Sequence, residues 1–129
     1  MLTYIKSEAA FKSQILSTTG PQGISDEEVN LWFQLSVHNH GTRRLPQVIS
    51  YLEDRQRMQG SWIQSLTRLD IPCHILWGKA DSVAPTEIAV KLASEIPNSK
   101  VTWLESGHYP MSEDTTEWVN AALAFYQRK

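Results

Sequence analysis

Two short apolar runs with a helical pattern between them constrain the fold of this chain most. The first run covers residues 71–77 and the second covers residues 100–104. Apolar residues at four-residue spacing from Ile88 to Ile96 predict a helix that begins near Thr86. Short, almost wholly apolar runs are typical of parallel strands whose two faces are both covered. The order strand, helix, strand therefore predicts a right-handed βαβ unit.

The first half of the chain has helical patterns and lacks a good strand. Ser25 and Glu28 have the spacing of a capping box, which predicts the start of a helix. A second helical region is expected to break or kink at Gly60. We therefore predict two parts: a helical segment over residues 1–69, and an α/β part over residues 70–129 with the order βαβα.

An acid and a histidine follow the two predicted strands. Asp81 comes after the first and His108 after the second. Because the carboxyl ends of parallel strands meet at one edge of a sheet, both side chains are expected at the edge where such sheets bind ligands. A carboxylate on one ring nitrogen orients a histidine that acts as a base. Taken alone, Asp81 could simply form a turn, and His108 could be a polar residue whose hydrogen bonds serve only the fold. Because the two residues follow neighbouring strands, a catalytic pair is favoured.

Other polar and aromatic residues have simpler interpretations. His74 and Cys73 lie inside the first predicted strand and are expected to pack in the core. Two further histidines stand in a loop without additional metal ligands at zinc spacing, so a surface position is favoured over a metal site. The last helix is predicted to open at residues 112–114, with acidic groups at the positive end of its dipole. Three aromatic residues of the first half could line a pocket, although core packing is favoured: Trp32, Tyr51 and Trp62.

Composition excludes several classes of partner. The net charge of −2 argues against nucleic acid and acidic membranes. A single cysteine, Cys73, rules out an intrachain disulfide, and no stretch is long and apolar enough for a signal peptide or a membrane span. We expect a cytoplasmic protein that acts on a small molecule and needs neither cofactor nor metal.

Two motifs resemble the α/β-hydrolase family. Residues 71–85 are similar to its strand and acid loop, with Ile-Pro, an apolar run, Gly, two residues, Asp, then Val and Pro. Residues 105–110, Glu-Ser-Gly-His-Tyr-Pro, resemble its last strand end and histidine loop. Residues 45–62 are similar to a helical cap segment in the branch of epoxide hydrolases and haloalkane dehalogenases, which includes the mesoderm-specific transcript proteins. The resemblance implies that Asp81 is the triad acid and His108 the triad base.

The rest of the family pattern has no counterpart in this sequence. Gly60-Ser61-Trp62 is not a nucleophile elbow, because no Gly stands two residues after Ser61. His40-Gly41 lacks the strand that precedes the oxyanion loop of the family. The resemblance therefore implies a partial fold: a cap segment plus the last two strands, with an open edge on the first of them.

The resemblance leads to two hypotheses on function. In the first, the chain is a C-terminal fragment that supplies acid and base for hydrolysis of an ester, an epoxide or a carbon–halogen bond, with a Ser or Asp nucleophile outside it. Such a chain is expected to be inactive alone and to associate with the missing N-terminal half or with itself. In the second hypothesis, it is a non-catalytic binding or interaction module derived from the hydrolase fold.

Overall fold

The chain forms two compact units. The computed structural model describes residues 7–127, of which unit 1 comprises 7–17 and 24–62, and unit 2 comprises 18–23 and 63–127. Unit 2 thus includes a short segment from the first half that no sequence pattern assigned to it. The predicted organisation into a cap-like part and a hydrolase part stays a prediction, since compactness alone does not define function.

Unit 2 is built on a parallel pair of strands. β1 (Cys73–Gly78) pairs with β2 (Ser99–Leu104), and the register runs from Cys73 opposite Ser99 to Gly78 opposite Leu104. α5 (Thr86–Glu95) connects them and begins at Thr86, as predicted. This βαβ unit confirms the α/β fold class. Because the strands are parallel and in register, their carboxyl ends lie side by side.

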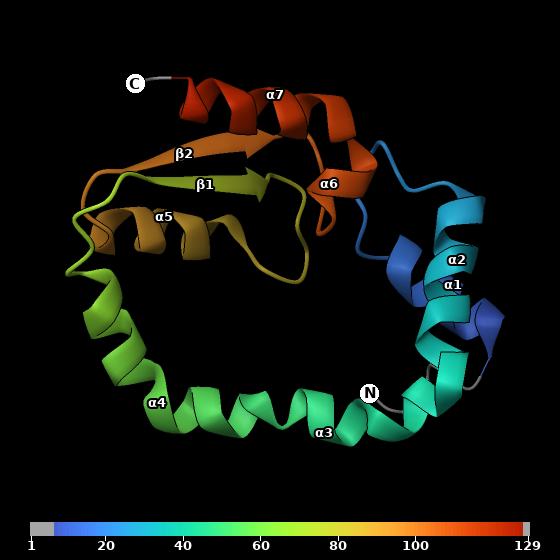
Figure 1. The fold of residues 1–129 in the computed structure, drawn as a ribbon. Coiled ribbons are helices and arrows are strands. Elements are labelled where there is room, and N and C mark those ends of the chain that lie inside the picture. Colours follow the sequence, from blue (N-terminus) through green and yellow to red (C-terminus); the bar gives the residue numbers. More distant parts are fainter. Residues whose placement is uncertain (1–6, 128–129) are drawn as a thin grey trace. The chain divides into compact units, whose positions relative to one another are not determined.

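Two helices cover the sheet of unit 2. α5 contacts one face and α7 (Thr115–Tyr126) contacts the other, as Figure 1 shows. Leu104 at the end of β2 and Ala89 of α5 are fully buried. Burial of apolar side chains between sheet and helices is the dominant favourable contribution to such a fold, and here it fixes the strand ends from which the site loops leave.

The last helical region differs from the prediction of one helix that opens at residues 112–114. A short helix, α6 (Pro110–Glu113), comes first, and α7 begins only after Asp114. Asp114 is the N-cap of α7, since its Oδ1 accepts a hydrogen bond from the Glu117 backbone N–H at 3.0 Å. Glu113 is buried and does not serve the dipole of the last helix.

Unit 1 is helical throughout its regular structure. α1 (Glu8–Leu16) is followed by α2 (Asp26–Val37), the 3-10 segment η2 (His38–Arg44), α3 (Leu45–Ile49) and the start of α4 (Tyr51–Leu66). The predicted helix start is confirmed, because the Ser25 hydroxyl accepts a hydrogen bond from the Glu28 N–H at 3.2 Å. Ile24 and Val29 on either side of this cap are buried and form the core of the unit.

Two expectations for the long helix are wrong. α4 runs through Gly60 without a break, since the good helix formers around it offset the cost of about 1 kcal/mol that glycine imposes. Tyr51 and Trp62 are 55% and 47% exposed, so neither packs in a core. The apolar side chains of Val48 in α3 and Leu52 in α4 are exposed as well. A helical apolar stripe predicts which residues share a face, but not whether anything covers that face.

Candidate active site

Asp81 is fixed by the loop that follows β1. Its Oδ1 accepts hydrogen bonds from the backbone N–H groups of Val83 at 2.9 Å and Ala84 at 2.8 Å. The indole N–H of Trp77, near the end of the strand, donates to the Ala84 carbonyl at 3.0 Å and ties the far side of the loop back to the sheet. The acid is therefore held by its own loop, with its side chain only 9% exposed.

The acid loop and the histidine loop are joined by backbone hydrogen bonds. The N–H of Lys79 donates to the Leu104 carbonyl and the N–H of Ala80 donates to the Ser106 carbonyl, both at 2.9 Å. These bonds continue the strand pairing beyond its last residue. Gly78 makes the approach possible, because a Cβ at that position would overlap the carbonyl oxygens of Ser106 and Gly107. The two loops consequently leave the sheet as one body.

This arrangement brings the two predicted site residues together. His108 Nδ1 lies 3.0 Å from Asp81 Oδ2 and 3.1 Å from Oδ1. Burial, the largest influence on the acid, opposes its ionisation. It is outweighed by hydrogen bonds from the Ala84 N–H, His108 and the Val83 N–H and by attraction to His108, so the pKa of Asp81 is lowered. Asp81 is thus a carboxylate that accepts, and Nδ1 of His108 carries the hydrogen that it donates.

The pair has the geometry of a histidine base with an orienting acid. With Nδ1 donating to the carboxylate, Nε2 of His108 is the ring nitrogen that can take up a proton. The carboxylate also stabilises the positive ring that proton uptake creates. His108 is 33% exposed, so a reacting group can approach it, whereas its partner acid is shielded.

The ring of Tyr109 packs against the ring of His108. The two rings stand edge-on, with centroids 5.0 Å apart. Burial raises the pKa of Tyr109, repulsion from Asp81 and Glu113 adds to it, and a hydrogen bond with the Thr18 side chain opposes it. Tyr109 is accordingly a neutral phenol over the whole physiological range.

The remaining predicted residues lie outside this pair. His74 is half-buried in β1 rather than in the core, although it makes packing contacts there: its Nε2 is 2.8 Å from the Thr102 hydroxyl, and its ring lies 4.9 Å from that of Phe125. Cys73 is only half-buried rather than a core residue. It begins the strand at the end opposite to the site, which leaves its side chain partly open to solvent.

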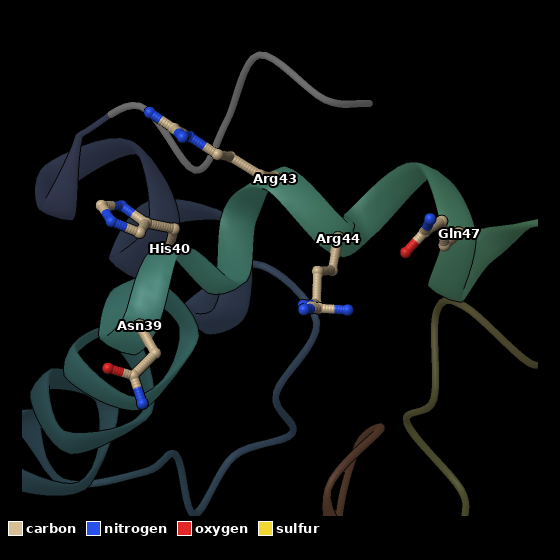
Figure 2. Close-up of a pocket in the computed structure, with 5 residues that line it drawn as sticks. All are labelled: Asn39, His40, Arg43, Arg44 and Gln47. Carbon is tan, nitrogen blue, oxygen red and sulfur yellow. The ribbon is translucent and has the colours of Figure 1, made fainter.

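A hollow in unit 1 gathers polar residues but no catalytic arrangement. It encloses about 380 Å³ and is lined by Asn39, His40, Arg43, Arg44 and Gln47. Figure 2 shows that these side chains diverge rather than converge on one point. His40 and Asn39 are exposed, which agrees with the predicted surface position of this loop. Within residues 7–127, no cluster of three or more His, Cys, Asp or Glu side chains is arranged to hold a metal ion.

Sequence patterns missed one residue next to the site. Glu113 was predicted only as a helix-end acid, yet its carboxylate accepts hydrogen bonds from the backbone on both sides of His108. Residue spacing gives no signal for these contacts, because the donors are backbone N–H groups, which every residue except proline carries.

No helix in the described part of the chain is both long enough and apolar enough to cross a membrane.

Curated proteins similar to this chain come from mammals and mycobacteria. The mesoderm-specific transcript protein of Mus musculus is 26% identical over 130 residues, which covers 97% of this chain and 38% of the mouse protein. A Mycobacterium tuberculosis protein that carries the hydrolase name LipZ is 31% identical over 102 residues, 78% of this chain and 35% of that protein. The chain therefore spans little more than a third of these relatives. No family model matches it.

Solved structures with a similar course of the chain are α/β-hydrolases. A serine hydrolase involved in carbazole degradation superposes with a TM-score of 0.73 at 19% identity, over 95% of this chain and 48% of that enzyme. An esterase from Exiguobacterium antarcticum superposes with a TM-score of 0.63 at 22% identity, over 92% of this chain and 42% of the esterase. At these identities the likeness concerns the fold alone. The chain has part of the α/β-hydrolase fold.

Proposed function

We propose that this chain supplies the acid and the base of a charge-relay triad for a hydrolase whose nucleophile lies outside these 129 residues. The observation that carries the proposal is the hydrogen bond from His108 Nδ1 to the Asp81 carboxylate, 3.0 Å long and formed at adjacent strand ends. The chain spans 38% of the mouse relative, which leaves ample length for a nucleophile in a protein of that size.

The reaction follows from the free nitrogen of the histidine. Nε2 of His108 takes the proton from the hydroxyl of the nucleophile while the hydroxyl oxygen attacks the electrophilic carbon of the substrate. Asp81 stabilises the positive charge that His108 then carries. The proton then passes to the leaving group. In the second half, Nε2 takes a proton from water, the resulting hydroxide oxygen attacks the covalent intermediate, and the proton returns to the nucleophile.

An ester is the substrate class that we favour. The structural relatives include a serine hydrolase and an esterase by name, and a serine nucleophile with an acyl intermediate suits an ester. An aspartate nucleophile would form an alkyl-enzyme ester instead, and His108 would then act only on water. Epoxides and carbon–halogen bonds are the substrates of that second route. The helical segment before residue 70 is proposed to serve as a cap over the substrate.

A chimera tests this proposal. The portion of the carbazole-degrading serine hydrolase that superposes on this chain is replaced by the chain, and hydrolysis of a p-nitrophenyl ester is measured. We expect turnover that falls by orders of magnitude in His108→Ala and Asp81→Asn, and that survives in the controls His38→Ala and Asp70→Asn, which alter residues outside the pair. Turnover that persists in a folded His108→Ala chimera would contradict the proposal.

A non-catalytic interaction module is the second candidate. It is favoured by the apolar side chains that stand exposed on the helices of unit 1, namely Leu31, Leu35, Val48, Tyr51 and Leu52. In that case a partner would bind through these side chains, and His108→Ala would leave binding unchanged. Turnover of the chimera that depends on His108 favours the first candidate, whereas self-association that is lost on polar substitution of Leu35 and Val48 but kept in His108→Ala favours the second.

A further inference from the structure

We propose that Glu113 is a positioning residue that sets the place of His108; this inference rests on the proposed function, in which His108 is the base. The Glu113 carboxylate accepts three backbone hydrogen bonds. Oε2 accepts from the Gly107 N–H at 2.8 Å and from the Gly20 N–H at 2.6 Å, and Oε1 accepts from the Tyr109 N–H at 3.0 Å. One side chain thus holds the residue before His108, the residue after it and a third segment.

Glu113 is buried with a relative exposure of 8%. Burial of a carboxylate is costly unless hydrogen bonds or opposite charges compensate for the lost water. Here the backbone supplies that compensation, since each oxygen is aimed at N–H groups and hydrogen bonds to a charged acceptor are about twice as strong as neutral ones. A neutral side chain of the same shape would lose part of this compensation, so the site is specific for a carboxylate.

The segment from Thr18 to Gly20 completes the support. The backbone N–H of His108 donates to the Thr18 carbonyl at 3.0 Å, and the Tyr109 side chain is hydrogen-bonded to the Thr18 side chain. Gly20 and Gly107 approach so closely that a Cβ on Gly20 would lie 2.5 Å from the Gly107 nitrogen. Three consecutive N–H groups, of residues 107–109, are therefore all held from within unit 2.

This backbone hold determines the geometry of the pair. Because Gly107, His108 and Tyr109 are each tied by their N–H groups, the His108 side chain starts from a fixed point and reaches Asp81 at 3.0 Å. The acid loop is tied to the residue that precedes Gly107, because the Ala80 N–H donates to the Ser106 carbonyl. Displacement of a catalytic group by about 1 Å costs on the order of a hundredfold in rate. Loosening the hold by Glu113 is therefore expected to reduce catalysis without contact between Glu113 and the substrate.

The test compares Glu113→Gln with Glu87→Gln in the whole 129-residue chain by NMR. The Glu113→Gln substitution keeps the shape of the side chain but presents an NH₂ group where an oxygen accepted, whereas Glu87 is an acid in the first turn of α5, away from these contacts. We expect the His108 Nδ1–H resonance, shifted downfield by the carboxylate, to be present in the wild type and in Glu87→Gln and to be lost in Glu113→Gln. Amide exchange at Gly20, Gly107 and Tyr109 should accelerate at least about tenfold in Glu113→Gln.

The readouts separate positioning from mere stability. A purely structural Glu113 would lower the melting temperature and leave the downfield resonance in the molecules that stay folded. If the downfield resonance and the amide exchange rates are the same in Glu113→Gln as in the wild type, Glu113 has no positioning role. The proposed function is not affected by that result. A wild type without the resonance overturns both, because there is then no pair to position.

A second measurement keeps the inference open to refutation if Glu113→Gln does not fold. In the wild-type chain the amides of Gly20, Gly107 and Tyr109 share one acceptor group, so their protection from exchange should agree within a few-fold. If these three amides exchange as fast as those of an unstructured peptide, their hydrogen bonds to Glu113 are refuted. In the chimeric hydrolase, Glu113→Gln should lower kcat about tenfold or more with KM unchanged.

Discussion

Replacing Asp81 with Asn removes one charge from the centre of the candidate site and changes little else. The side-chain shape is kept, and the Asn oxygen can still accept from the N–H groups of Val83 and Ala84. The new NH₂ group, in contrast, cannot accept the hydrogen that His108 Nδ1 now donates. The substitution thus converts charged hydrogen bonds into neutral ones and removes the acceptor of the histidine.

The size of the effect follows from these three hydrogen bonds. A hydrogen bond to a charged group contributes about 1.5–3 kcal/mol and a neutral one about 0.5–1.5 kcal/mol. The two backbone bonds should each lose about 1 kcal/mol, and the bond to His108, which is partly exposed, about 1 kcal/mol more. Since the Asp81 side chain is only 9% exposed, solvent screens these bonds little. We expect the free energy of unfolding to fall by about 3 kcal/mol at neutral pH.

The difference between the two proteins should depend on pH in one direction. Because the folded state lowers the pKa of Asp81 below its ordinary value of 3.8, the unfolded chain takes up the proton first as the solution is acidified. The stability that the carboxylate contributes is therefore complete above about pH 4 and is lost as the pH falls through the folded-state pKa. The wild type should approach the stability of Asp81→Asn in acid.

Urea denaturation followed by tryptophan fluorescence measures this difference, because Trp77 and Trp103 lie in the two strands. Asp70→Asn is the matched control, an exposed acid of the same unit that should change stability by less than about 0.5 kcal/mol. Equal stability of Asp81→Asn and the wild type at pH 7 would refute the reasoning. So would a difference that persists undiminished at the acid end of the series.

Three further substitutions and one control substitution test the packing around the site by the same denaturation assay. Gly78→Ala should lower stability by about 1–3 kcal/mol, because its Cβ would overlap the Gly107 carbonyl; an unchanged midpoint would show that the loops are not in contact. Ser106→Ala should raise stability by about 1 kcal/mol, since the buried Ser106 hydroxyl has no hydrogen-bond partner among the described residues. Leu104→Ala should lower stability by about 2–5 kcal/mol, whereas Leu123→Ala, at a half-exposed residue, should have a much smaller effect.

The parts of the site that sequence could predict are those that local patterns encode. Apolar runs and helical spacing predicted β1, α5 and β2 closely, and the parallel topology then placed Asp81 and His108 at one edge. Strand direction is a strong constraint, because it sends both loops to the same side of the sheet whatever their sequences are. The distance of 3.0 Å between the two side chains could not be predicted, since it depends on the loop hydrogen bonds of Lys79 and Ala80.

In unit 1, helical patterns in the sequence predicted the secondary structure well but predicted the burial of side chains poorly. Ser25 caps α2 as its sequence spacing predicts, because capping involves only the neighbouring turn. Tyr51 and Trp62 fit an apolar face of α4 and are nevertheless exposed. Whether a face is covered depends on residues distant in sequence, and for a chain that spans about a third of its relatives those residues need not be within it.

Glu113 illustrates the limit of local reasoning most clearly. An acidic residue near a helix start is adequately explained by the helix dipole, so the sequence offers no reason to search for another role. Its partners are backbone N–H groups, of which one belongs to Gly20, 93 residues earlier. Backbone groups have no residue-type signature, and a contact with them leaves no trace in composition or spacing. The contact explains why segment 18–23 belongs to unit 2: the carboxylate that holds the histidine loop also holds that segment.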